Sequence, residues 1–137
     1  MKTILKLIAT SFLTVMLTLP VSTIWAADVE PNKKRGRVYF KMVCTVCHIQ
    51  NAAKPIPPNT YTMDEWRAYM DAGKHDLTGN SNPSLAYYMS TEYRESVKET
   101  NKAAKKFLAL PEDQVYADVR DFVVSGAKDS DTPASCE

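Results

Sequence analysis

Apolar residues recur every three to four positions over most of the chain beyond residue 30, which is the spacing of one face of an α-helix. This pattern predicts a first helix over about residues 31–47 and a second over about residues 62–73. A third helical stretch covers about residues 83–109, and a last helix covers about residues 111–127. We find no useful run of alternating apolar and polar residues, the pattern of a half-buried strand. The sequence therefore predicts an all-α fold of about four to five helices.

The expected helix ends carry residues that start and stop helices. Thr62 and Glu65 have the spacing of a capping box, and Gly73 is placed to end the same helix. The third helical stretch is expected to break near Ser90 or Thr91, because either hydroxyl can cap a new helix start. These signals agree with the apolar spacing and support the predicted boundaries.

The first 26 residues have the layout of a secretory signal peptide. Lys2 and Lys6 precede an apolar run over residues 7–19, and the small residues Ala26 and Ala27 follow it. This run is too short to cross a bilayer comfortably. We expect cleavage near Ala26 and export to a bacterial periplasm, so the 137-residue chain loses 26 residues and keeps 111, with no transmembrane segment. An uncleaved anchor is the alternative.

Removal of this leader leaves a nearly neutral domain. The leader holds two of the 17 lysines and arginines and none of the 16 acidic residues, so 15 cations face 16 anions and the net charge is −1. This balance gives no electrostatic basis for binding nucleic acid. The basic run Lys-Lys-Arg-Gly-Arg at residues 33–37 is read as a solvated helix start. Its alternative role is a docking patch for an acidic redox partner.

The stretch Cys-Thr-Val-Cys-His carries the most specific chemistry in the chain. Residues at i, i+3 and i+4 project from the same side of a helix, so Cys44, Cys47 and His48 can act together. Cys-x-x-Cys-His is the attachment signal of c-type haem. It predicts one covalently attached haem c, with Cys44 and Cys47 as thioether donors and His48 as the proximal ligand of the iron.

Three rival interpretations of this motif explain less. A zinc site needs four ligands, and only His75 and Cys136 remain to complete one. A thioredoxin-like dithiol needs a preceding strand and a βαβ unit, which the sequence pattern does not contain. A structural disulfide between the two cysteines leaves His48 without a role.

At these residues the chain resembles the class I, mitochondrial-type cytochromes c, as found among exported bacterial mono-haem proteins. Gly36 and Phe40 precede Cys44 by eight and four residues, as a glycine and an aromatic do in the first helix of that family. Val119 and Phe122 match the aliphatic and aromatic of the family's last helix. The resemblance implies that these two pairs meet where the two helices cross.

A third stretch, Thr-Met-Asp-Glu-Trp-Arg-Ala-Tyr-Met-Asp-Ala-Gly-Lys, resembles the family's middle helix, which lines the haem pocket. The resemblance implies a cytochrome c-like bundle wrapped around one covalently bound haem, with Trp66 in an apolar pocket. We expect this cytochrome domain to cover residues 27–128, and residues 129–137 to form a flexible tail.

The sixth iron ligand departs from the family pattern. The family usually supplies a methionine followed by proline, and no Met-Pro pair occurs in this chain. Our candidate distal ligand is His75, because it directly follows the pocket helix. Met89 is the alternative distal ligand. The other interpretation of Met89 is that it only packs in the hydrophobic core. Met63 and Met70 are read as pocket lining, and an open sixth position is the remaining possibility.

Two further expectations follow from the resemblance. A backbone carbonyl near Pro57 or Pro58 is expected to accept a hydrogen bond from the ring of the proximal histidine. The segment over residues 83–109 is an addition to the minimal family pattern and serves as haem cover, docking face or extra core. Cys136 is left unpaired by the haem and is read as a free thiol or an intermolecular bridge.

The predicted function is that of a periplasmic single-electron carrier between a donor and an acceptor redox protein, and not that of an enzyme. Two alternatives stay open. One is a fixed haem subunit of a larger respiratory or dehydrogenase complex, with residues 83–109 as its interface. The other is a haem-based ligand sensor with an open sixth position.

Overall fold

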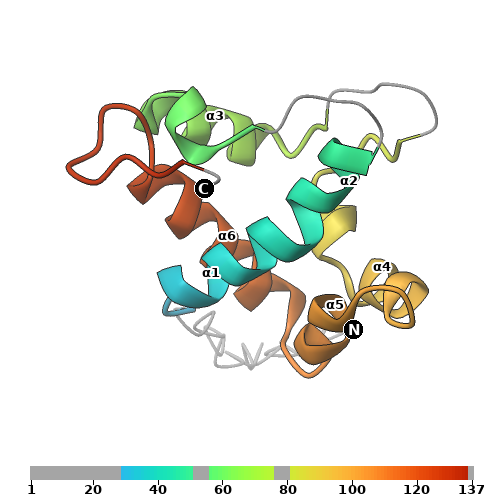
Figure 1. Ribbon diagram of the computed structural model, residues 1–137. Coiled ribbons are helices and arrows are strands. Elements are labelled where there is room, and N and C mark those ends of the chain that lie inside the picture. Colours follow the sequence, from blue (N-terminus) through green and yellow to red (C-terminus); the bar gives the residue numbers. More distant parts are fainter. Residues whose placement is uncertain (1–28, 51–55, 76–80, 136–137) are drawn as a thin grey trace, which may run out of the picture.

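The described part of the protein is built almost entirely from helices. The computed structural model describes residues 29–50, 56–75 and 81–135 (Figure 1). Its elements are α1 (Lys33–Tyr39), η1 (Phe40–Cys44), α2 (Thr45–Gln50), η2 (Pro58–Thr60), α3 (Met63–Ala72), η3 (Ala86–Met89), α4 (Thr91–Val97), α5 (Lys102–Phe107) and α6 (Glu112–Ser125). Across these ranges the only extended pairing is an isolated bridge between Lys74 and Ser84. The predicted all-α class is confirmed.

The elements α1, η1 and α2 form one continuous helix from Lys33 to Gln50 (Figure 1). Its middle, η1, is a π-helical turn, in which the Thr45 backbone N–H donates to the Phe40 carbonyl five residues earlier. The Thr45 hydroxyl donates to the same carbonyl at 3.0 Å. A π-helical turn contains one residue more than an α-helical turn and often lies next to a functional site. This one immediately precedes Cys47 and His48.

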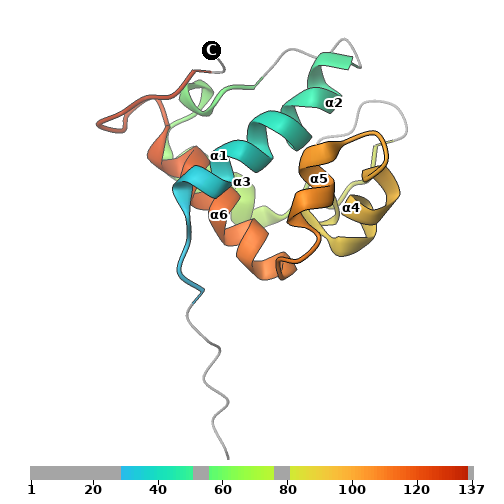
Figure 2. The ribbon, with the colours of Figure 1, turned by 60° about the horizontal axis from the view of Figure 1, so that its bottom comes forward.

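The crossing of α1 and α6 depends on the missing side chain of Gly36 (Figure 2). A Cβ at Gly36 would overlap the Asp118 carbonyl and lie 3.0 Å from the Val119 nitrogen. One turn further along, the rings of Phe40 and Phe122 pack with centroids 5.6 Å apart. The predicted meeting of the glycine and aromatic of the first helix with the last helix is confirmed.

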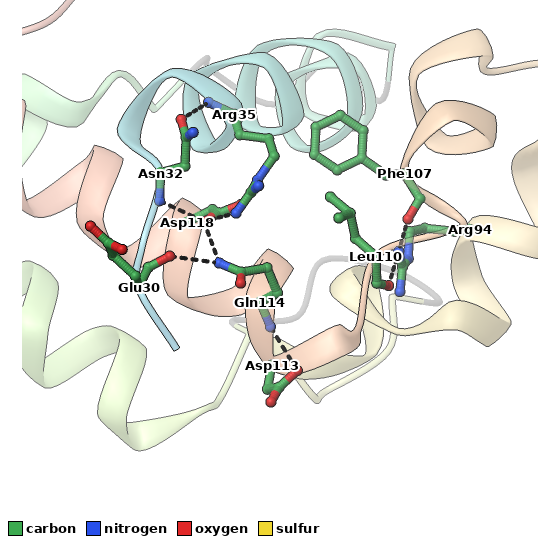
Figure 3. Close-up of polar contacts among 9 residues, drawn as sticks. All are labelled: Glu30, Asn32, Arg35, Arg94, Phe107, Leu110, Asp113, Gln114 and Asp118. Atoms are coloured by element: carbon green, nitrogen blue, oxygen red, sulfur yellow. Dashed lines mark hydrogen bonds and ion pairs between the residues drawn. The ribbon is translucent and has the colours of Figure 1, made fainter. Parts of the chain in front are cut away.

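A buried carboxylate fixes the start of α1 against α6 (Figure 3). The Asp118 side chain is fully buried and accepts a hydrogen bond from the Asn32 backbone N–H at 2.7 Å. It also accepts from the Arg35 guanidinium, with one contact at 2.9 Å, and from the Gln114 amide at 2.9 Å. These donors satisfy a charge that would otherwise be costly to bury.

The capping box predicted for α3 is present. The Thr62 hydroxyl accepts from the Glu65 backbone N–H at 3.2 Å, and the Glu65 carboxylate accepts from the Thr62 N–H at 2.7 Å. The helix ends at Gly73, whose φ of 61° is the left-handed conformation that glycine adopts without strain. On its inner face, the indole N–H of buried Trp66 donates to the Pro58 carbonyl at 2.6 Å.

Residues 83–109 form η3, α4 and α5 rather than one long helix. The predicted break is confirmed, because the Ser90 hydroxyl accepts from the Tyr93 N–H at the start of α4. A second break occurs at Asn101, which caps α5. Fully buried Arg94 joins these pieces by donating to the carbonyls of Phe107 and Leu110 (Figure 3).

The segment after α6 runs back across η2 and the start of α3 (Figure 1). The Ala134 carbonyl accepts from the Asn59 N–H at 3.1 Å, and the Asp129 carboxylate accepts from the Met63 N–H at 2.8 Å. We expected residues 129–137 to be a flexible tail. In the described part, residues 129–135, backbone hydrogen bonds instead connect this segment to the domain. The predicted leader and Cys136 lie outside the described residues.

Within the described ranges, no helix combines the length and the apolar content needed to cross a bilayer.

Candidate haem site

Cys44, Cys47 and His48 lie on the continuous helix at the end of η1 and in α2. All three side chains are half-buried, and neither thiol forms a disulfide in this structure. The helical backbone gives these residues the i, i+3, i+4 spacing expected from the sequence. The three groups are therefore available on one turn of one element.

The environment of Cys44 is unlike that of a reactive dithiol. Burial raises the pKa of the Cys44 thiol to about 12, with a further contribution from neighbouring Cys47. Nucleophilic cysteines of redox motifs have a lowered pKa and are thiolates near neutral pH. Cys44 is a neutral thiol at pH 7, which does not favour a thioredoxin-like activity.

Cys47 lies next to α4. Its sulfur is 3.5 Å from the hydroxyl of Tyr93 in α4. Burial, followed by this contact with Cys47, raises the pKa of Tyr93, so its phenol is protonated at neutral pH. The attachment motif is thus packed directly against α4.

His75 faces the attachment motif from a different part of the chain. The ring centroids of His48 and His75 are 5.9 Å apart and their planes are inclined by 71°. Because a metal–imidazole bond is about 2 Å long, two imidazoles on opposite sides of one iron have centroids about 6 Å apart. Each ring can rotate about the shared axis through the metal, so the two planes can enclose any angle. His48 and His75 are therefore the two residues that could hold one iron together.

Backbone pairing fixes the position of His75. The His75 N–H donates to the Pro83 carbonyl at 2.9 Å, and the Leu85 N–H donates to the Gly73 carbonyl at 2.9 Å. These bonds flank the bridge between Lys74 and Ser84. The residues directly after α3 are therefore tied to the start of the added segment.

A cluster of tyrosines completes this side of the site. Tyr88 packs against His75 with ring centroids 4.9 Å apart. Tyr88 in turn contacts Tyr87 at 5.4 Å and Tyr93 at 5.2 Å. Its carbonyl accepts from the Tyr39 hydroxyl at 2.6 Å, and its hydroxyl accepts from the Asn82 N–H at 2.7 Å. Sequence reasoning named none of these tyrosines as site residues, although two are adjacent in Leu-Ala-Tyr-Tyr-Met.

The three methionines considered as iron ligand or pocket lining lie in the hydrophobic core or pack against it. Met89 and Met70 are each only 2% exposed and belong to the hydrophobic core. Met63 is partly buried and packs against that core. Core packing, the alternative given for Met89, accounts for its burial without a metal. The ring centroid of His75, by contrast, lies 5.9 Å from that of His48.

The expected acceptor for the His48 ring is not at Pro57 or Pro58. The Pro58 carbonyl accepts from the Trp66 indole, and the Pro57 carbonyl accepts from the Thr60 N–H. Nδ1 of His48 is buried and has no hydrogen-bond partner among the described residues. A buried polar atom left in this state costs about 1–3 kcal/mol. Among the described residues, this ring nitrogen is therefore available to a further group.

The described residues fit a covalently bound haem. Two thiols and one imidazole share a helical turn, a second imidazole lies opposite the first, and one buried ring nitrogen is unsatisfied. Among the described residues, no three His, Cys, Asp or Glu side chains converge on a site for a bare metal ion. Comparisons with known proteins find no matching family model, no matching curated protein and no matching solved structure.

Proposed function

We propose that this protein is an exported mono-haem c-type cytochrome that passes single electrons between redox proteins in the periplasm. The observation that supports this most strongly is the pair His48 and His75. These residues are 27 positions apart in the sequence, yet their rings lie 5.9 Å apart. One belongs to a Cys-x-x-Cys-His motif, so the second imidazole faces the iron ligand that the motif predicts.

In this proposal, Cys44 and Cys47 hold the haem through two thioethers, and His48 and His75 bind the iron. When bound, haem supplies a one-electron couple between ferric and ferrous iron. The protein's part would be to hold the iron with two imidazoles, which would exclude small ligands. Two imidazoles also set a lower potential than a histidine and a methionine would. Trp66 is buried, and we expect it to belong to an apolar pocket that would keep the surroundings of the haem apolar.

The test is expression of the full chain in a host that assembles c-type cytochromes. The purified protein should gain the mass of one haem, and Cys44→Ser/Cys47→Ser should lose that covalent gain. A colourless protein with the mass of its amino acids alone would overturn the proposal.

The axial assignment is tested by spectra of His75→Ala, His75→Met and Met89→Ala. His75→Ala should lose the low-spin spectrum, His75→Met should change it, and Met89→Ala should retain it. An unchanged spectrum in His75→Ala would show that the distal ligand is wrong. Rapid, strong binding of carbon monoxide to the reduced wild type would favour the sensor alternative. Purification with a stable partner would favour the fixed subunit.

A further inference from the structure

The outer face of the helix from α1 to α2 exposes apolar side chains. Val38 is 47% exposed, Met42 is 53% exposed and Ile49 is 62% exposed. Val38 and Met42 are four residues apart and therefore lie on the same side of the helix. A surface helix normally has polar residues on its outer face. Val38 and Met42 thus form a small apolar strip where solvation favours polar groups.

One edge of this strip carries cations. Lys33, Lys34 and Arg37 of α1 are all exposed. The whole stretch over residues 31–50 contains no aspartate or glutamate. Arg35 belongs to the same helix but differs from these three cations, because it forms an ion pair with Asp118. Glu30 is the acidic residue that precedes this stretch, and it forms no ion pair with Lys33, Lys34 or Arg37 in the described part of the chain.

Helix α5 supplies cations at the other edge. The Asn101 amide at its start donates to the Met42 carbonyl at 2.8 Å, and Phe107 at its end packs on Tyr39 with centroids 4.9 Å apart. These two contacts place α5 alongside α1 and η1, as Figure 2 shows. Its exposed residues include three lysines, namely Lys102, Lys105 and Lys106.

The six cations are not compensated. In the described part of the chain, Lys33, Lys34, Arg37, Lys102, Lys105 and Lys106 form no ion pair, whereas Arg35, Arg67, Lys98, Arg120 and Lys128 do. The expected mature chain is close to neutral, so this is a local accumulation of charge. Protein interfaces commonly have an apolar centre within a polar rim, with methionine and arginine enriched.

We propose that this surface, Val38 and Met42 between the cations of α1 and α5, is a docking face for an acidic protein. A membrane-binding helix would present a broad apolar face with Trp, Phe or Leu, which this strip does not have. Cations at the rim speed association and make it dependent on salt, while the small apolar centre keeps the complex short-lived. This inference does not rest on the haem, because it uses only surface residues.

The test uses the mature chain and a synthetic helical peptide that carries a leucine stripe flanked by glutamates. Fluorescence anisotropy at low salt should detect binding to the wild type. Lys34→Glu/Lys105→Glu should weaken the affinity by at least about tenfold, because both edges lose a cation and gain an anion. Val38→Ser/Met42→Ser should weaken it by about three- to tenfold through lost apolar burial. Circular dichroism checks that each variant is folded.

The matched control is Arg67→Glu/Lys128→Glu, which changes the net charge equally at residues outside the face. Its affinity should stay within about twofold of the wild type. An equal loss in this control would show that net charge alone binds the peptide and would overturn the proposal. The same conclusion follows if the peptide does not bind, or if Val38→Ser/Met42→Ser has no effect. Tighter binding to phosphatidylglycerol vesicles or to duplex DNA through the same residues would overturn the choice of partner.

Discussion

Gly36 of α1 lies directly against the backbone carbonyl of Asp118 in α6, with no room for even a methyl group between the two helices. The contact is between backbones, so rotation of a side chain cannot relieve an overlap. It joins the start of the motif helix to the last helix of the chain. The position of Cys44, two turns further along, depends on this crossing.

Replacing this glycine should therefore destabilise the fold. Gly36→Ala should lower the free energy of unfolding by about 3 kcal/mol, since the helices must separate to accept the methyl. Gly73→Ala is the control, because a Cβ there meets open space and only the left-handed backbone is strained. It should cost about 1 kcal/mol. Urea titration monitored by circular dichroism measures both, and equal losses would contradict the crossing argument.

The buried charge of Asp118 predicts a second stability effect. Asp118→Asn keeps the shape but removes the anion that accepts from Arg35 and from the Asn32 N–H. The expected loss is about 2–3 kcal/mol, at the lower end for a buried pair because Arg35 is partly exposed. Asp64→Asn, which breaks an exposed pair with Arg67, should cost less than about 0.5 kcal/mol. An unchanged free energy of unfolding in Asp118→Asn would show that the charge of Asp118 contributes nothing to stability.

Two carboxylates that accept hydrogen bonds at the starts of α3 and α4 predict how stability depends on pH. Hydrogen bonds from the Thr62 N–H and hydroxyl lower the pKa of Glu65, and the Thr91 N–H and hydroxyl do the same for Glu112. A pKa that is lower in the folded state stabilises the protein above the unfolded pKa of about 4.3. That stabilisation is lost as the pH falls through the lower, folded values.

Glu65→Gln/Glu112→Gln should therefore be less stable than the wild type at pH 7, and the difference should shrink as the pH falls below about 4. Urea midpoints measured between pH 3 and pH 7 test this. A difference that grows toward acid pH would reverse the sign of the effect and refute the capping explanation.

Tyr88 is expected to hold His75 in place. Aromatic contacts of this kind contribute about 1 kcal/mol, so Tyr88→Leu should raise the displaced fraction of His75 by about fivefold. In the haem-loaded protein this should appear as faster binding of carbon monoxide and a smaller low-spin fraction. Tyr88→Phe keeps the ring and should restore the wild-type rate. If both variants behave like the wild type, the backbone bridge alone positions His75.

Local signals made part of this structure predictable. The capping box at Thr62, the glycine stop at Gly73 and the new start at Ser90 each involve neighbours within four residues, and all three are present. These three features need no information about distant parts of the chain. The crossing at Gly36 was expected for another reason, since the resemblance to the cytochromes c implied that this glycine meets the last helix.

Other features depend on long-range contacts that no local pattern contains. Nothing in the sequence distinguishes Arg94 from the other charged residues. It is nevertheless fully buried and donates to carbonyls 13 and 16 residues further along the chain. Tyr88 becomes relevant only because the chain folds back at Lys74 and Ser84. The expected histidine acceptor near Pro58 is not found, since Nδ1 of His48 has no partner among the described residues and the Pro58 carbonyl accepts from the Trp66 indole.

The π-helical turn η1 separates two geometric requirements within a single helix. Gly36 lies before it and faces α6, whereas His48 lies after it and its ring lies near that of His75. Deleting one residue between Phe40 and Cys44 would restore uniform winding and rotate the second half by about 100° relative to the first. The extra residue thus sets the rotation of the second half of the helix relative to the first. The packing of Gly36 on α6 and the direction of the His48 side chain can therefore be satisfied separately within one helix.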